Sequence, residues 1–273
     1  YKGFGGRLPV KAEIEKHYAG KTPNFRCNAY EDFRAMLEKE KAIDAVLCAT
    51  PDHLHAHVSI VAMRQGKHMF CEKPLTHSVA EARAVARVAA ETGVATQMGN
   101  FGHSGENIRR TVEWVQAGAI GTVREVHAWS HNSRAPDRMG RPPEEPVPAG
   151  LNWDLWLGPR EPRPYSSNYA PVTWRNYWAF GTGTLGDMAC HNLDSAFWAL
   201  DLAAPLTIEA SCAHGKVMDS EVVPLAAIYR YTYGPRGNLP PLEMKWYDGG
   251  LMPKTPPELE EERTLGQGGN GIL

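Results

Sequence analysis

The sequence predicts an α/β protein with two domains: a parallel, doubly wound sheet, then an α/β domain with a mostly antiparallel open sheet. Short apolar runs alternate with capped helical runs up to about residue 122, and later runs alternate like strands with one wet face. The 26 glycines and 21 prolines among 273 residues give more turns than a helical bundle needs. We therefore expect domains at residues 1–122 and 123–273.

Each short strand of the first domain is expected to lead into a helix. Ser78 and Glu81 have the spacing of a capping box, and Gly66, Gly93 and Gly118 stand where helices should end. The expected elements are a helix at 31–39, a strand at 43–49, a helix at 55–65, a strand at 67–71, a helix at 78–91, a strand at 94–98 and a helix at 104–117.

Open parallel sheets bind ligands outside the carboxyl ends of their strands. The loops at 50–55, 72–74 and 99–103 follow three predicted strands, so we expect them around one crevice. The strands expected in the second domain are 123–129, 207–213, 226–233 and 242–247.

A predicted helix at 185–200 carries the most informative polar residues. At about 100° per residue, it places Asp187, His191, Asp194 and Trp198 on one stripe. A carboxylate one turn from an imidazole fixes its tautomer and raises its basicity, as a general base for a hydroxyl requires. The alternative is an acid favoured by the helix dipole on a solvated face, and the tryptophan in line argues against it. The opposite, apolar face is expected to hold Ala189, Leu193, Ala196, Phe197 and Leu200.

The tripeptide Glu72-Lys73-Pro74 directly follows a predicted strand. A lysine held between an acid and a rigid proline at the mouth of the crevice can bond a substrate hydroxyl or a cofactor ribose. The alternative is a surface ion pair at a turn, and the position after a strand argues against it.

Three alternating histidines, His53, His55 and His57, would share one face of a strand and could bind a metal there. Pro51 stops the preceding strand, and the following apolar residues have helical spacing, so we expect a helix on which the three rings do not converge. No metal site is predicted. His53 or His55 could instead lie over a cofactor.

Aromatic residues surround Arg175, with Trp174 and Trp178 beside it and Trp153 and Trp156 upstream. Carbohydrate sites use stacked aromatic rings flanked by polar groups, but aromatic rings also fill protein cores. The sequence leaves both interpretations open.

Composition limits the partners and the compartment. A formal charge of −2 gives no electrostatic footprint for nucleic acid, and no apolar run approaches the length of a membrane span. The five cysteines are odd in number and contain no Cys-x-x-Cys pair, which favours buried packing residues in a reducing compartment, the cytoplasm. An exported form stays open as the alternative.

Four motifs occur together and in order: Ala49-Thr-Pro-Asp-His-Leu-His55, Glu72-Lys73-Pro74, Thr96-Gln-Met-Gly-Asn-Phe-Gly-His-Ser104 and Gly186-Asp187-Met-Ala-Cys-His191-Asn-Leu-Asp194. Together they resemble the glucose–fructose oxidoreductase, inositol dehydrogenase and rhizopine-catabolism (Gfo/Idh/MocA) family of NAD(P)-dependent oxidoreductases. The resemblance implies a Rossmann domain, an α/β domain whose open sheet builds dimers or tetramers, and hydride transfer between a sugar or cyclitol hydroxyl carbon and NAD or NADP.

The resemblance also implies roles for single residues. Lys73, Asp187 and His191 correspond to the catalytic group, with His191 as general base and the other two orienting the hydroxyl. The residues expected at the cofactor are Thr50, Pro51, Asp52, His55, Glu72, Lys73, Gln97 and Asn100. Those expected at the substrate are His103, Arg175, Trp178 and Asp194.

The sequence departs from the family pattern at both ends. Gly3-Phe-Gly-Gly6 is not the Gly-x-Gly-x-x-Gly fingerprint, because no strand precedes it and no acid follows at the expected distance. The run 268–273 resembles the approach to a strand that does not follow. We therefore expect a fragment that lacks the first strand and the glycine-rich turn, and whether this fragment is active alone stays open.

Three further hypotheses stay open at this point. One is a glycosidase on the same fold that uses tightly held NAD for transient oxidation and re-reduction. Another is a metal-dependent hydrolase that uses the three histidines. In the third, the chain binds no dinucleotide because the glycine-rich turn is missing.

Overall fold

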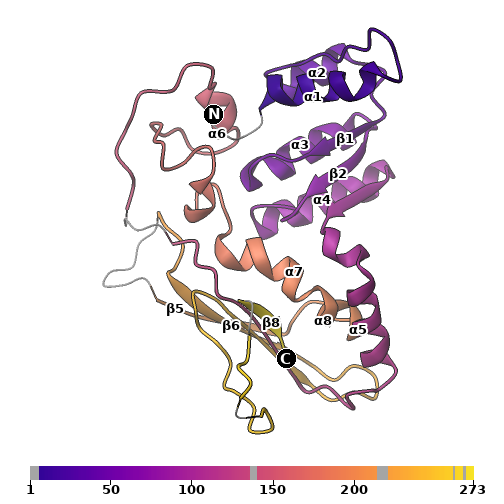
Figure 1. The fold of residues 1–273 in the computed structure, drawn as a ribbon, viewed down its shortest axis with the longest axis vertical. Coiled ribbons are helices and arrows are strands. Elements are labelled where there is room, and N and C mark those ends of the chain that lie inside the picture. The colour runs from indigo at the N-terminus through magenta and orange to yellow at the C-terminus, as the bar shows by residue number, and fades with distance from the viewer. Residues whose placement is uncertain (1–5, 136–139, 214–220, 261, 267–268) are drawn as a thin grey trace.

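The computed structural model describes residues 6–135, 140–213, 221–260, 262–266 and 269–273. Gly3 and the run 136–139 therefore lie outside the described residues. Two sheets lie one above the other, with helices around the first and between the two (Figure 1). Among the described residues, no helix is both long and apolar enough to cross a bilayer.

The first sheet is parallel, as predicted, with the order β1-β2-β3. Its strands are β1 (Ala45–Cys48), β2 (His68–Glu72) and β3 (Thr96–Gly99), and its helices are α2 (Phe33–Lys39), α3 (Asp52–Arg64) and α4 (Val79–Thr92). The capping box of Ser78 and Glu81 is present. The core between sheet and helices contains Val46, Met63 and Val88, whereas Leu47 on the opposite face is 67% exposed.

The helix α1 (Arg7–Ala19) was not predicted. It begins after Gly6 without a side-chain cap and buries none of its residues, so neither of the usual sequence signals marks it. In contrast, α3 begins three residues before the predicted start, because Pro51 takes the N-cap position.

The second sheet has the order β5-β6-β7-β4-β8, and only its β4–β7 pair is parallel. The strands β5 (Thr207–Ala213), β6 (Ala226–Tyr233) and β7 (Leu242–Tyr247) have the predicted bounds, and β4 covers Glu125–Ser130. The expectation for residues 268–273 was wrong: β8 (Asn270–Ile272) forms and pairs antiparallel with β4.

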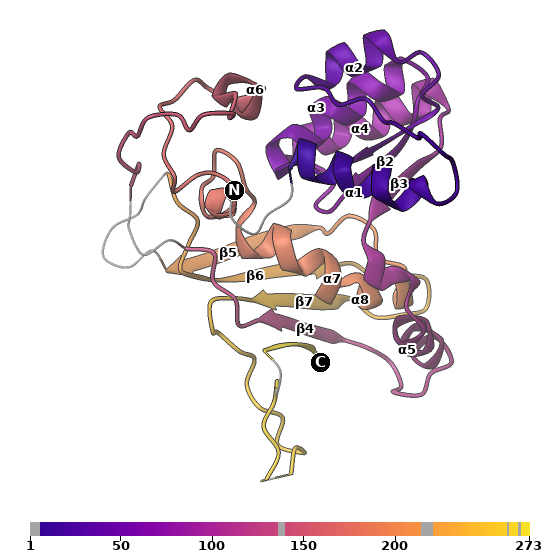
Figure 2. The same ribbon diagram turned by 45° about the horizontal axis from the view of Figure 1, so that its top comes forward.

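The predicted single helix at 185–200 was also wrong. The segment consists of a π-helical turn η3 (Leu185–Ala189), a short helix α7 (Cys190–Asn192) and a helix α8 (Asp194–Ala199). Figure 2 shows α7 and α8 on the face of the second sheet that is turned toward the first sheet. Within the segment, Ala189 of η3, Leu193 between the two helices and Ala196 of α8 pack in the core of that sheet. Phe197, predicted on the apolar face, is 38% exposed, because the breaks rotate α8.

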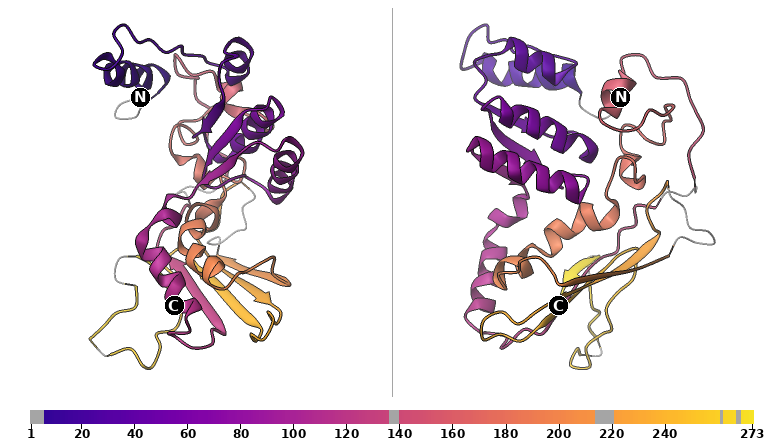
Figure 3. Two further views of the ribbon diagram at one scale, coloured as in Figure 1. Left: turned by 90° about the vertical axis from the view of Figure 1, so that its right-hand side faces the viewer. Right: turned by 180° about the vertical axis from the view of Figure 1, so that it is seen from behind.

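The remaining elements lie in two connections, one between the two sheets and one after β4. The turn η1 (Phe101–Ser104) and the helix α5 (Glu106–Gln116) lead from β3 down beside α8 (Figure 3). The helix α6 (Trp153–Leu157) and the turn η2 (Thr173–Asn176) belong to the long connection between β4 and η3. Aromatic residues of this connection form a third core with Tyr169 and Phe180.

Candidate active site

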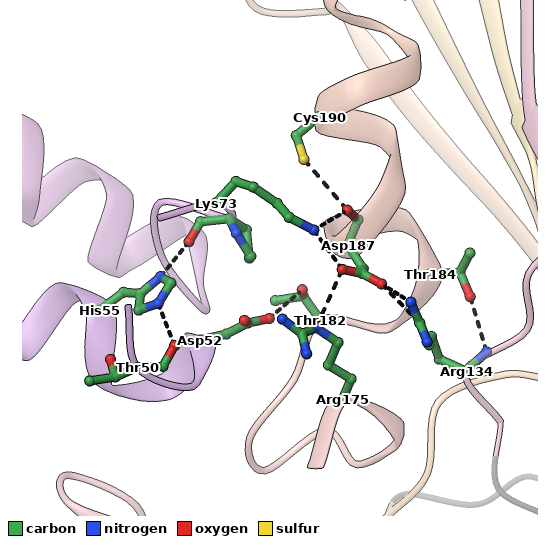
Figure 4. A network of polar contacts seen from close by, with 11 residues as sticks. Thr50, Asp52, His55, Lys73, Arg134, Arg175, Thr182, Thr184, Asp187 and Cys190 are labelled. Carbon is green, nitrogen blue, oxygen red and sulfur yellow. Dashed lines mark hydrogen bonds and ion pairs between the residues drawn. The ribbon is translucent and has the colours of Figure 1, made fainter. Parts of the chain in front are cut away.

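The buried carboxylate of Asp187 meets side chains from both domains (Figure 4). The Lys73 ammonium donates to its Oδ1 at 2.7 Å and to the Asp187 carbonyl at 2.9 Å. Arg134 donates to Oδ2 from Nε at 2.9 Å, and Arg175 Nε lies 3.3 Å from Oδ1. One buried acid therefore holds three cations from three distant parts of the chain.

The protonation state of Asp187 follows from these neighbours. Burial alone would raise the pKa of this carboxyl group. The hydrogen bond and charge of Lys73, with the charges of Arg134 and Arg175, outweigh burial and hold the pKa below its usual value. Asp187 is therefore an anion at neutral pH.

His191 follows Asp187 by four residues, and its surroundings differ from those of Asp187. Among the residues that the structure describes, none donates to or accepts from its ring nitrogens, and its ring lies 5.8 Å from that of Phe101. Partial burial, followed by the charge of Lys73, lowers the pKa of His191. At neutral pH the ring is uncharged and keeps a lone pair with which to accept a proton.

The predicted pairing of Asp187 with the His191 imidazole does not form. The π-helical turn changes the spacing of the two residues, and the three cations occupy the carboxylate. The rest of the predicted stripe does face the first domain. Asp194 contacts His103 Nδ1 at 2.9 Å, and Trp198 stacks on the His103 ring at 4.3 Å.

The local sequence explains how the chain packs so closely here. A Cβ on Gly181 would lie 2.4 Å from the Arg175 Cα, and a Cβ on Gly186 would lie 2.1 Å from the Thr182 hydroxyl. Only glycine fits at either position without moving backbone or side chain. These two glycines let the segment around Arg175 and Thr182 approach Asp187.

The predicted cofactor residues fall into two groups. Thr50, Glu72, Lys73 and Asn100 stand at the carboxyl ends of the three parallel strands, as predicted. The exposed side chain of Gln97 lies within β3 and donates to the Met98 carbonyl at 2.8 Å, so it does not reach this edge.

Asp52 and His55 are each only 1% exposed and make internal contacts. The Thr182 hydroxyl donates to Asp52 Oδ2 at 3.1 Å, and burial raises the pKa of this acid to about 6. The two ring nitrogens of His55 face the carbonyl oxygens of Thr50 and Pro74, both at 2.7 Å (Figure 4). The His55 ring thereby ties the loop after β1 to the loop that carries Lys73, and Pro51 caps α3 between them.

The predicted substrate residues are also spread out. His103 and Asp194 pair with each other, whereas Arg175 stacks on Trp174 with 4.1 Å between guanidinium and ring centre. Trp178 is 39% exposed, and its carbonyl accepts from His77.

The open question about the other aromatic residues is answered by their packing. Trp153 and Trp156 stack on each other at 4.7 Å and pack against Phe180 in a core. Both rings are partly buried and contribute to packing.

The three histidines of α3 do not converge, as predicted. His53 approaches the Trp156 carbonyl at 2.7 Å, His55 the two loop carbonyls, and His57 the ring of Phe33. The arrangement required by the metal-dependent hydrolase hypothesis is therefore absent from these three residues.

The sequence analysis missed Arg134 and Thr182. Arg134 follows β4 in an irregular stretch that has no motif, so only the fold brings it to Asp187. Thr182 lies between the two closely packed glycines, and that glycine-rich run was the available signal.

Two family descriptions match the chain. One, an oxidoreductase family with an NAD-binding Rossmann fold, covers residues 12–100, and the other, the C-terminal α/β domain of the same oxidoreductase family, covers residues 127–236. The chain belongs to the Gfo/Idh/MocA oxidoreductase family.

Named relatives agree with this membership. Levoglucosan dehydrogenase of Pseudarthrobacter phenanthrenivorans is 28% identical over 176 residues, which are 62% of this chain and 36% of that protein. The scyllo-inositol 2-dehydrogenase (NAD⁺) of Bacillus subtilis is 35% identical over 109 residues, 39% of this chain and 31% of that enzyme. An oxidoreductase domain protein from Kribbella flavida superposes with a TM-score of 0.55 at 26% identity, over 89% of this chain and 56% of that structure. The matched segments thus span about a third of these two curated relatives.

Proposed function

We propose that this chain forms the catalytic part of an NAD(P)-dependent dehydrogenase that oxidises a hydroxyl carbon of a sugar or cyclitol. The contact between Lys73 and Asp187 carries the proposal: a lysine at the end of a strand of the NAD-binding domain meets an acid of the second domain, beside an uncharged histidine. The substrate class is supported by the names of the two curated relatives, a levoglucosan dehydrogenase and a scyllo-inositol 2-dehydrogenase.

The residues at the strand ends suit the nicotinamide end of the cofactor. Asn100 is buried at the end of β3, and its Oδ1 has no hydrogen-bond partner among the described residues. A buried acceptor without a donor is costly, and an amide or hydroxyl of a bound nicotinamide riboside would satisfy it. Thr50, Pro51 and Glu72 stand at the same edge of the sheet. No described turn between a strand and a helix has the Gly-x-Gly-x-x-Gly spacing, so these residues do not supply the pyrophosphate cradle.

Three side chains have separate roles in the reaction of the substrate. His191 accepts the hydroxyl proton on a ring nitrogen, because it is uncharged at neutral pH. Lys73 donates a hydrogen bond to the substrate oxygen and orients it. Asp187 holds Lys73 in place and balances its charge. Bound NAD(P)⁺ supplies the hydride acceptor.

The outer part of the site is assigned to the rest of the substrate. The half-exposed His103, paired with Asp194, offers a hydrogen-bond group, and Trp178 offers an exposed ring. Arg175 reaches Asp187 and gives a cationic edge between them.

The test is an assay of the protein with NAD⁺ or NADP⁺ and a panel of sugars, anhydrosugars and cyclitols. We expect reduced cofactor to accumulate in equal amount with a ketone product, and Lys73→Met and His191→Ala each to lower turnover by about 100-fold or more. Release of a sugar without net reduction of cofactor would favour the glycosidase instead. Unchanged turnover in both variants would reject the site.

Four further properties belong to this proposal. The domain boundary at 122/123 is supported by the interval between α5 and β4. A cytoplasmic location is supported by five cysteines that all stay free.

A homo-oligomer is supported by β5, which is exposed along its whole length. Light scattering, which measures the molar mass in solution, tests the oligomeric state. The charge of −2 argues against nucleic acid or an anionic membrane as a partner.

A further inference from the structure

Two cysteines and a histidine converge beneath the crevice loops. Cys48 ends β1 and Cys71 lies directly opposite it on β2, so the two thiols point from the same face of the sheet. His55 lies on α3, which packs on that face. The two sulfur atoms and one ring nitrogen of His55 all lie within 4.8 Å of one another. The three side chains are only 1–2% exposed.

This ligand set has a definite chemical preference. Two thiolates and an imidazole suit soft or borderline d¹⁰ cations, whereas Mg²⁺ and Ca²⁺ prefer oxygen ligands. A further donor is close, because the Thr50 hydroxyl lies 3.3 Å from the Cys48 sulfur. Among the described residues, no other cluster of three such ligands occurs, and the remaining cysteines, Cys27, Cys190 and Cys212, do not belong to it.

We propose that Cys48, Cys71 and His55 form a binding site for one thiophilic cation such as Zn²⁺, separate from the residues that contact the substrate. Binding releases the two thiol protons to solvent, and the coordinating ring nitrogen gives up any proton that it carries. The three ligand atoms already lie within 4.8 Å of one another, close to the separations that tetrahedral coordination of zinc requires.

Binding also has a consequence for the crevice loops. The ring nitrogen that coordinates the cation carries no proton, so the carbonyl oxygen that now faces it at 2.7 Å, that of Thr50 or of Pro74, must move aside. The other ring nitrogen donates to the remaining carbonyl. One of these loops carries Lys73, and the other begins at the end of β1. The cation therefore loosens one of the two crevice loops, and we expect it to inhibit the proposed dehydrogenase activity.

The first experiment needs no variant. The chain is loaded with one equivalent of Zn²⁺, and X-ray absorption at the zinc edge gives the ligand shell. We expect two sulfur atoms at about 2.3 Å and at least one nitrogen at about 2.0–2.1 Å. A shell of nitrogen and oxygen alone, as surface histidines and carboxylates would give, overturns the proposal, and so does a single sulfur.

The second experiment identifies the sulfurs. Cd²⁺ is titrated into the chain, and thiolate-to-cadmium charge-transfer absorption is followed. Cys48→Ala and Cys71→Ala are each expected to weaken binding by about 100-fold or more, while the matched controls Cys212→Ala and Cys190→Ala bind as the wild type does. Circular dichroism checks that each variant folds. Loss of binding in Cys190→Ala, with Cys48→Ala unaffected, would overturn the assignment.

The third experiment tests the loop. Hydrogen exchange of the backbone amides around Thr50 and around Lys73 is compared with and without one equivalent of Zn²⁺. We expect faster exchange in one of the two loops. Unchanged exchange in both loops, with zinc bound through two sulfurs, would reject the inhibitory role.

Discussion

The two walls of the candidate site use their histidines in opposite ways. On the wall formed by the loops after β1 and β2, His55 is fully buried, and both of its ring nitrogens face backbone carbonyls. On the wall formed by residues 185–199, His191 is half-buried and has no polar partner among the described residues. The comparison teaches that a ring held between two backbone carbonyls fixes the backbone, whereas a ring with a free nitrogen can exchange a proton.

The largest expected effect comes from removing the acid on which both walls depend. Asp187→Ala leaves three partly buried cations close together, and we expect it to lower the free energy of unfolding by about 3 kcal/mol. Urea denaturation measures the change. The matched control is Glu106→Ala, an exposed acid paired with Arg110, which should change stability by less than about 0.5 kcal/mol. A loss below about 1 kcal/mol for Asp187→Ala would contradict the interpretation.

His191→Ala separates chemistry from stability on the second wall. We expect kcat to fall by about 100-fold or more, while the free energy of unfolding changes by less than about 1 kcal/mol. The pKa of His191 lies below its usual value, so kcat/KM in the wild type should rise with pH through that pKa and then level off. The variant should lack this rise, and a pH profile identical to that of the wild type would exclude His191 as the base. His127→Ala, on β4, serves as the control.

The variant Asp52→Asn tests how much the burial of the charged Asp52 carboxylate lowers the free energy of unfolding. Burial raises the pKa of Asp52 from 3.8 to about 6, so the folded protein holds this proton more tightly than the unfolded chain. Wild-type stability should therefore fall as the pH rises from about 4 to about 6, and the variant should lack this fall.

At pH 7 we expect the Asp52→Asn variant to be more stable by about 2–3 kcal/mol. The amide oxygen still accepts from Thr182, so the native contact is kept. Thermal unfolding at several pH values measures the difference. Equal pH dependence in both proteins would show that Asp52 is not the group responsible.

The smallest effect on stability is expected for His103, at the outer edge of the candidate site. His103 pairs with Asp194 and stacks on Trp198, but its side chain is half exposed, so His103→Ala should cost only about 0.5 kcal/mol of stability. If His103 contacts the substrate, KM should rise several-fold while kcat stays within about two-fold. A large fall in kcat would instead assign it to the reaction itself.

The local sequence pattern predicted the structure correctly wherever residues within one helix or strand determine it. The parallel pairing of the first sheet, the capping box at Ser78 and the bounds of β5, β6 and β7 could be predicted from apolar spacing and turn residues. The helix α1 was not predicted, because none of its residues is buried and its sequence therefore has no apolar face. The breaks in residues 185–199 escaped because a π-helical turn leaves the apolar spacing nearly helical.

The sequence by itself determined the fold class, the parallel strands whose carboxyl ends form the crevice edge, and the chemical types of Lys73, Asp187 and His191. Only the tertiary structure decided that Asp187 binds three cations and not His191, and that His55 meets Cys48 and Cys71. The physical reason is that these contacts join residues up to 114 positions apart. Periodicity reports the face of one element, whereas a long-range polar contact depends on how two elements pack.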